Sequence, residues 1–120
     1  MPKGWDLSTL IAQFVWTAAS STGTVAFGIS AIALDNDDAL GFARVGDGVG
    51  AVVVTTDTLI TVADVHIHDE STAITVAGSP TDEEWVFFEV FRDISADTLA
   101  ADAKLIGVKI HYTTATGKDT

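Results

Sequence analysis

The chain has 120 residues, 48% of them hydrophobic, which is enough for one domain with its own core. Seventeen Asp and Glu against six Lys and Arg give a formal net charge of −11. Such a chain repels phosphate backbones and anionic lipids, so we expect neither nucleic acid nor a membrane as a partner. The lack of cysteine excludes disulfides and thiolate metal sites. Without a signal-peptide pattern, the protein is expected to be made in the cytoplasm.

Short runs of β-branched and aromatic residues, separated by Gly, Asn, Asp and Ser, predict an all-β fold. The expected strands are Leu10–Ala18, Thr24–Leu34, Val52–Thr56, Leu59–His68, Ala73–Ala77, Trp85–Phe91 and Lys104–Thr113. The segment 35–50, first acidic and then rich in glycine, is expected to be a long loop. Seven or eight strands at this spacing predict an antiparallel β-sandwich, and an eight-stranded jelly roll is the expected arrangement.

The expected organisation is an N-terminal arm at 1–9, a sandwich domain at 10–114 and a flexible tail at 115–120. Trp5 and Leu7 lie in the arm, and Leu10 follows it. Because an exposed tryptophan is unfavourable unless it docks, we expect Trp5, Leu7 and Leu10 to contact a neighbouring subunit or another protein of an assembly. Trp16 and Trp85 lie inside apolar strands and are expected in the core.

Arg92 directly follows the aromatic strand, and the acidic residues Asp93, Asp97 and Asp102 come soon after it. A guanidinium is a rigid fork of donors that can hold a carboxylate and backbone carbonyls together. We therefore expect Arg92 to pin the connection between the last two strands, through Asp97 or Asp102. Ligand binding by Arg92 is the alternative. A structural role is preferred because the nearby carboxylates already supply partners for the guanidinium.

Asp64, His66 and His68 alternate along one expected strand, which places them on one face and Val65 and Ile67 on the other. Two imidazoles two residues apart can share a metal ion, as in the cupins. A metal site needs at least three ligands of fitting geometry, and only a pair is evident. The preferred interpretation is a polar outer face, with Asp64, His66 and His68 as a weaker metal-site alternative and no cofactor expected.

Other candidate sites are weaker. The acidic cluster at 35–38 offers oxygen ligands of the kind calcium prefers, but Asp and Asn also favour solvated turns. The sequence has no cysteine nucleophile and no Gly-x-Ser-x-Gly motif. We therefore do not expect an enzyme.

The last third of the chain carries a recognisable signature. An apolar strand closes in Arg92-Asp93; Asp97-Thr98-Leu99 and Asp102 follow; and Leu105-Ile106-Gly107-Val108 leads to Tyr112. This signature resembles the C-terminal part of a group of small, uncharacterised phage virion proteins, and segments 15–18 and 71–78 also look like that group. The resemblance covers about half of the chain. It implies a virion-type β-sandwich or jelly roll and transfers no catalytic residue.

Three functions are expected from these observations, in decreasing order. The first is a capsid decoration or cement protein that forms a homotrimer on the outside of the head and binds the major capsid protein or another virion protein. The second is the head or tip domain of a tail fibre or tail spike that binds a host-surface glycan. The third is a cupin-like metal-dependent enzyme. The trimer rests on analogy with phage proteins rather than on any residue.

Overall fold

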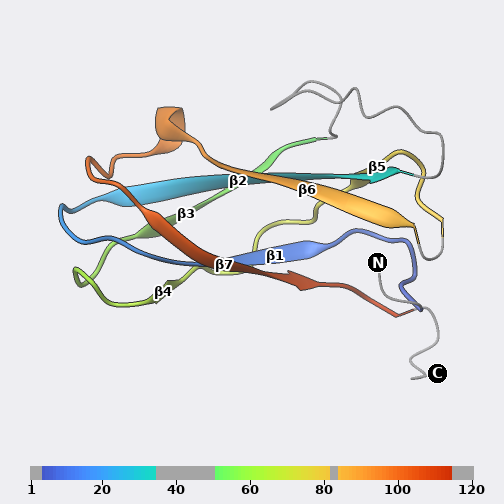
Figure 1. The fold of residues 1–120 in the computed structure, drawn as a ribbon, viewed down its shortest axis with the longest axis horizontal. Helices are drawn as coiled ribbons and strands as arrows, with labels where there is room; N and C mark the ends of the chain where they lie inside the picture. Colours follow the sequence, from blue (N-terminus) through green and yellow to red (C-terminus); the bar gives the residue numbers. More distant parts are fainter. Residues whose placement is uncertain (1–3, 35–50, 82–83, 115–120) are drawn as a thin grey trace.

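A computed structural model of the chain describes residues 4–34, 51–81 and 84–114 (Figure 1). These residues form an all-β sandwich of two packed sheets, as the sequence predicts. The elements are β1 (Ile11–Thr17), β2 (Thr24–Leu34), β3 (Val53–Thr58), β4 (His66–Ile67), β5 (Val76–Ala77), β6 (Trp85–Arg92), the short 3-10 turn η1 (Ile94–Ala96) and β7 (Lys104–His111). The described residues include no helix long and apolar enough to cross a membrane. The predicted loop at 35–50 and tail at 115–120 lie outside them.

The first sheet has the order β4-β1-β7, and both of its strand pairs are antiparallel. The pairing of β1 with β7 runs from Ile11 opposite His111 to Thr17 opposite Lys104. Its register shifts between Val15 and Trp16, because β7 carries one residue more than β1 at this point. Such a bulge bends the strand locally and strengthens its twist.

The second sheet is built around β2. One edge of β2 pairs with β6 over eight positions, and the other edge pairs first with β3 and then with β5. The short β5 runs parallel to β2, so the expectation of a wholly antiparallel sandwich is wrong at this pair. The chain leaves this sheet after β3, adds β4 to the first sheet and then returns, which allows β5 to enter in the parallel direction.

The core lies between the two sheets and follows the period-two alternation of the strands. Alternate residues of β1 are buried, and Phe14 and Trp16 are fully so. They meet Phe27 of β2, whose ring centroid lies 5.3 Å from that of Phe14 and 6.4 Å from that of Trp16. The contacts among these three aromatic rings join the two sheets, because β1 and β2 belong to different sheets.

Two predictions about the strands are wrong. The segment Leu59–His68 is a strand only at His66–Ile67, because Ala63 adopts a left-handed φ of 67° and its amide donates to the Ala18 carbonyl at 2.8 Å. The preceding residues therefore form a turn beside the end of β1. Trp85 is 76% exposed and lies outside the core, and the residues of β6 that pack against the core are only partly buried.

Candidate functional site

The connection between β6 and β7 is organised by Arg92. Its Nε donates to Asp97 Oδ2 at 2.7 Å and its Nη2 to Asp97 Oδ1 at 2.9 Å, a two-pronged ion pair. The same guanidinium donates to the carbonyl of Ala101 at 2.8 Å and to that of Leu99 at 2.6 Å. All of the acceptors belong to the segment that leads into β7. Asp102 is not among them and acts on Arg92 only through its charge.

Asp97 is almost completely buried, with 2% of its side chain exposed, and is held from several sides. Besides the Arg92 pair, it accepts from the backbone amides of Leu99 at 2.8 Å and Ala26 at 3.2 Å. The hydrogen bond from Arg92 is the main cause of a lowered pKa at Asp97, and burial works against it. Because Ala26 belongs to β2, this carboxylate ties the β6–β7 connection to the second sheet.

His66 faces inward, contrary to the expected polar outer face. Its Nδ1 lies 2.9 Å from the Asp64 carbonyl oxygen, and its Nε2 accepts from the Ile60 amide at 3.0 Å. This arrangement assigns the proton to Nδ1, which donates to Asp64. The ring also packs on Trp16 at a centroid distance of 5.0 Å. Both nitrogens are occupied by the backbone of the turn before β4, which leaves His66 in a structural role.

His68 is buried among aromatic rings, at 1% exposure. Its ring centroid lies 5.6 Å from those of Phe14 and Phe27 and 6.2 Å from that of Trp16. Neither ring nitrogen has a hydrogen-bond partner among the described residues. Burial lowers the pKa of His68, and the charges of nearby Asp57 and Asp69 oppose this only in part. The residue is a neutral core histidine at pH 7.

The proposed grouping of Asp64, His66 and His68 is therefore not a ligand set in this fold. Asp64 meets His66 through its backbone carbonyl, and His68 points into the aromatic core. Among the described parts of the chain, no group of three or more His, Asp or Glu side chains is placed to hold a metal ion. The alternation was predicted correctly, but the inward and outward faces were exchanged: Val65 and Ile67 are the exposed residues, at 62% and 61%.

The N-terminal segment packs on its own chain. Trp5 is 4% exposed and forms an antiparallel bridge with Thr114, and the amide of Asp6 donates to the Thr113 carbonyl at 2.9 Å. Leu10 is fully buried. The prediction that Trp5 and Leu10 contact another subunit is wrong, because both side chains are already covered within the monomer. Leu7, at 41% exposure, is the one member of the predicted trio that faces solvent.

One surface, on β6 and β7, is not predicted from the sequence. Large apolar side chains are exposed along these strands and just beyond them: Trp85, Phe87, Leu105, Ile106 and Tyr112. Trp85 and Phe87 share the outer face of β6, with ring centroids 6.5 Å apart. One signal in the sequence could have revealed this face, since Glu89 has the same parity as Trp85 and Phe87 and a carboxylate marks the outward side. We call these five residues the β6–β7 surface.

A second exposed apolar surface lies at the opposite edge of the first sheet, since β4 and β7 flank β1 on its two sides. It comprises Ile60, Val62, Val65 and Ile67, and we call it the β4 surface. Ile60 is the most exposed of these, at 86%. Single exposed apolar residues are ordinary on protein surfaces, whereas several along one edge of a sheet are candidates for a site of interaction. The chain thus carries two apolar surfaces on opposite sides of one sandwich.

Comparison with known proteins adds no relative: no family model, no curated protein and no solved structure matches this chain.

Proposed function

We propose that the chain is a structural subunit of a bacteriophage virion, in the first place a decoration protein that self-associates and binds the outside of the head. The signature at the end of the chain suggests the phage virion. The observation that carries a binding role is the pair of exposed apolar surfaces on opposite sides of the sandwich. A protein that holds its own copies and also attaches to a shell needs two such contact areas.

The scaffold between the two surfaces supports this function. Arg92 and Asp97 fasten the β6–β7 connection, and the turn before β4 is held by the ring of His66. A fixed backbone keeps the apolar side chains in place before a partner arrives, which reduces the entropy lost on binding. In this proposal the β6–β7 surface joins copies of the chain, and the β4 surface attaches to the major capsid protein or another virion protein.

The proposal is tested by mixing purified protein with empty capsids of the phage that encodes it and sedimenting the shells. Binding should saturate at a fixed number of copies per capsid, set by the shell lattice. Ile67→Asp places a charge in the β4 surface and should weaken this binding without unfolding the sandwich, because Ile67 is 61% exposed. Thr56→Asp, at an exposed position of β3, is the matched control. Sedimentation without saturation, or equal binding by both variants, would contradict the proposal.

The second candidate is a tail-fibre or tail-spike tip that binds a host-surface glycan. The exposed pair Trp85 and Phe87 favours it, because aromatic faces stack on the apolar faces of sugar rings. Binding to host cells that is lost in Trp85→Ala, with capsid binding absent, would select this candidate. The cupin-like enzyme has the least support, since both nitrogens of His66 are engaged by the backbone. Jelly-roll connectivity, an eighth strand and a homotrimer belong to the proposal.

A further inference from the structure

β6 and β7 are both edge strands. Among the described residues, β6 pairs only with β2, and β7 pairs only with β1. Figure 1 shows β6 and β7 on the same side of the sandwich, in front of β2 and β1. Each sheet therefore ends in a strand edge on this same side of the sandwich. A strand edge offers backbone donors and acceptors to another strand, and such edges are common points of association.

The core is less well covered on this side. Residues of β1 and β2 make up most of the fully buried core, whereas the inward residues of the edge strands are only partly buried: Val86, Phe88, Val90, Val108 and Ile110. The exposed residues of the β6–β7 surface lie on the same two strands or just beyond β7. Any partner that covers both edges also completes this half of the core.

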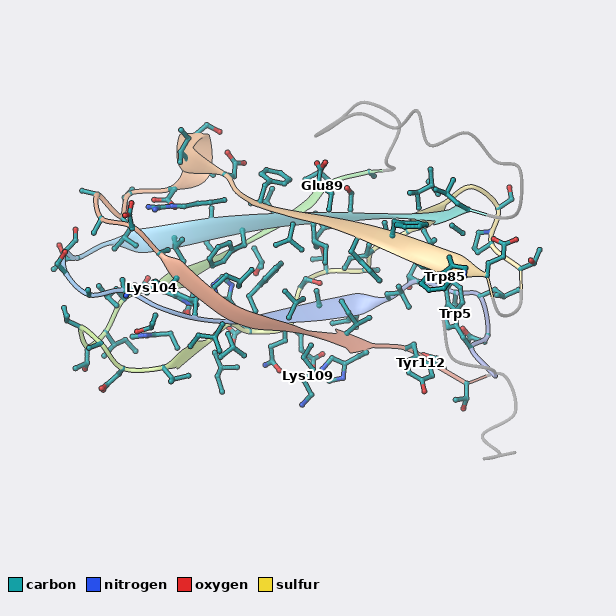
Figure 2. All side chains as sticks on the ribbon, viewed as in Figure 1. Trp5, Trp85, Glu89, Lys104, Lys109 and Tyr112 are labelled. Carbon is teal, nitrogen blue, oxygen red and sulfur yellow. The ribbon has the colours of Figure 1, made fainter. Side chains whose placement is uncertain are left out.

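The two strands run in opposite directions, and their charges differ in sign. In Figure 2, Trp85 and Tyr112 lie toward the same end of the molecule, and Glu89 and Lys109 both lie near its middle. Glu89 and Lys109 also share the outward side of their strands, since the inward positions are taken by Val90 and Val108. Only six Lys and Arg occur in the chain, and β7 contains two of them, Lys104 and Lys109.

These relations select one mode of association. Pairing β6 with β6 or β7 with β7 requires an axis that reverses the strands. When the paired strands overlap along their full length, this axis sets Glu89 near Glu89 or Lys109 near Lys109. An axis parallel to the strands instead brings β6 of one copy to β7 of the next, antiparallel, with Glu89 near Lys109. Opposite charges across a strand pair stabilise it, and like charges destabilise it.

We infer that the chain associates with its own copies by pairing the free edge of β6 with the free edge of β7 in the next copy, around an axis parallel to the strands. The pairing extends each sheet into the neighbouring subunit and covers Trp85, Phe87 and Ile106. Repeating this pairing around the axis gives a closed dimer. With a sharper bend between the sheets it gives the closed trimer expected from the phage analogy. The inference rests on the self-association part of the proposed function and assigns its surface.

The test is a charge exchange followed by light scattering. The wild-type mass should be a multiple of the 12.5 kDa chain. Glu89→Lys and Lys109→Glu should each weaken association about tenfold, because each replaces an attraction with a repulsion. The double variant should recover association, since the two charges are then exchanged rather than matched. That recovery cannot come from a folding defect, which the second substitution would only worsen.

Glu70→Lys is the matched control, because it makes the same charge change at an exposed position in the loop after β4. It should leave the mass unchanged. A wild-type monomer, or a double variant as dissociated as the single ones, would overturn the inference. Capsid sedimentation is measured separately on the same variants: a monomer that still saturates the shell would contradict this pairing and leave the virion function standing.

Discussion

The ring of Phe91 lies directly over Gly28, its cross-strand partner on β2. A Cβ atom built on Gly28 would come within 2.3 Å of the Phe91 ring. The aromatic side chain thus covers bare backbone on the outer face of the second sheet, where Ser30 is also fully buried. The pair replaces the side-chain contact that a glycine in a strand cannot make.

Gly28→Ala should destabilise the fold by about 1–2 kcal/mol, because the added methyl group displaces the Phe91 ring. Gly107→Ala on β7 is the matched control: nothing lies within 4 Å of the new methyl group, so its effect should stay within about 0.5 kcal/mol. Urea unfolding measures both. In a Phe91→Ala background the cost of Gly28→Ala should disappear, and an unchanged cost there would show that the ring is not its cause.

Arg92→Ala should cost about 3 kcal/mol or more, since it leaves the buried carboxylate of Asp97 without its cation and frees two carbonyls. Asp102→Asn should change stability by less than about 0.5 kcal/mol, because Asp102 contributes only charge at a distance. Chemical denaturation of the two variants distinguishes these roles. Equal losses would contradict the purely electrostatic role assigned to Asp102.

The lowered pKa of Asp97 gives a second prediction for the same corner. The unfolded chain binds a proton at Asp97 near the ordinary value of 3.8, whereas the folded chain binds it only at lower pH. The stability that this carboxylate contributes is therefore present above about pH 3.8 and is lost as the pH falls below it. Thermal melts of wild type and Asp97→Asn between pH 5 and pH 2.5 should converge. Curves that stay parallel would refute this origin.

His68 predicts a dependence at milder pH and with a different cause. Its folded-state pKa lies below the ordinary 6.5, so the unfolded chain takes up the proton first on acidification. Stability should fall as the pH drops below about 6.5. His68→Phe removes this dependence and should also stabilise the fold by about 1 kcal/mol at pH 7, because two unsatisfied nitrogens are no longer buried. Melting temperatures at pH 7.5 and 5.5 test both statements, and a variant with the wild-type slope would contradict the assignment.

Trp5→Ala should destabilise the monomer by about 3–5 kcal/mol, as expected for a tryptophan buried in a core. Leu7→Ala, two residues away and exposed, should have almost no effect on unfolding. Repeating the measurement in the Lys109→Glu background, in which association is weakened, separates folding from association. If Trp5→Ala changed only the oligomeric mass, the original expectation of an intersubunit arm would regain its place.

Patterns among neighbouring residues predicted the strands and contacts that depend only on neighbouring residues. The alternation in β1 and the single long strand at Thr24–Leu34 follow directly from the residues, and the proximity of Arg92 and Asp97 follows from their short separation. The alternation at His66 and His68 was also read correctly. Its direction was not, because strand periodicity identifies two faces without saying which one meets the core.

The errors share a dependence on contacts between distant residues. Trp5 is buried by its bridge to Thr114, and no pattern near Trp5 reports that partner. His68 is accepted into the core because Phe27, from the other sheet, meets its ring. Trp85 lies at the end of an edge strand, and the edge position becomes visible only when the strand order is known. Predicting the burial of each of these residues requires the strand order of the whole fold, which the composition of a single segment does not contain.

The first sheet also constrains the order of events in folding. Ile11 pairs with His111, 100 positions later, so β1 has no partner on that side until β7 has been synthesised. Closing so long a loop before its contacts form is slow, and β proteins dominated by such pairings fold in milliseconds to seconds. During translation, the edge of β1 that pairs with β7 therefore stays unpaired, close to the aromatic residues of β1. A nascent chain of this kind is the stage at which binding by a chaperone would have the greatest effect on yield.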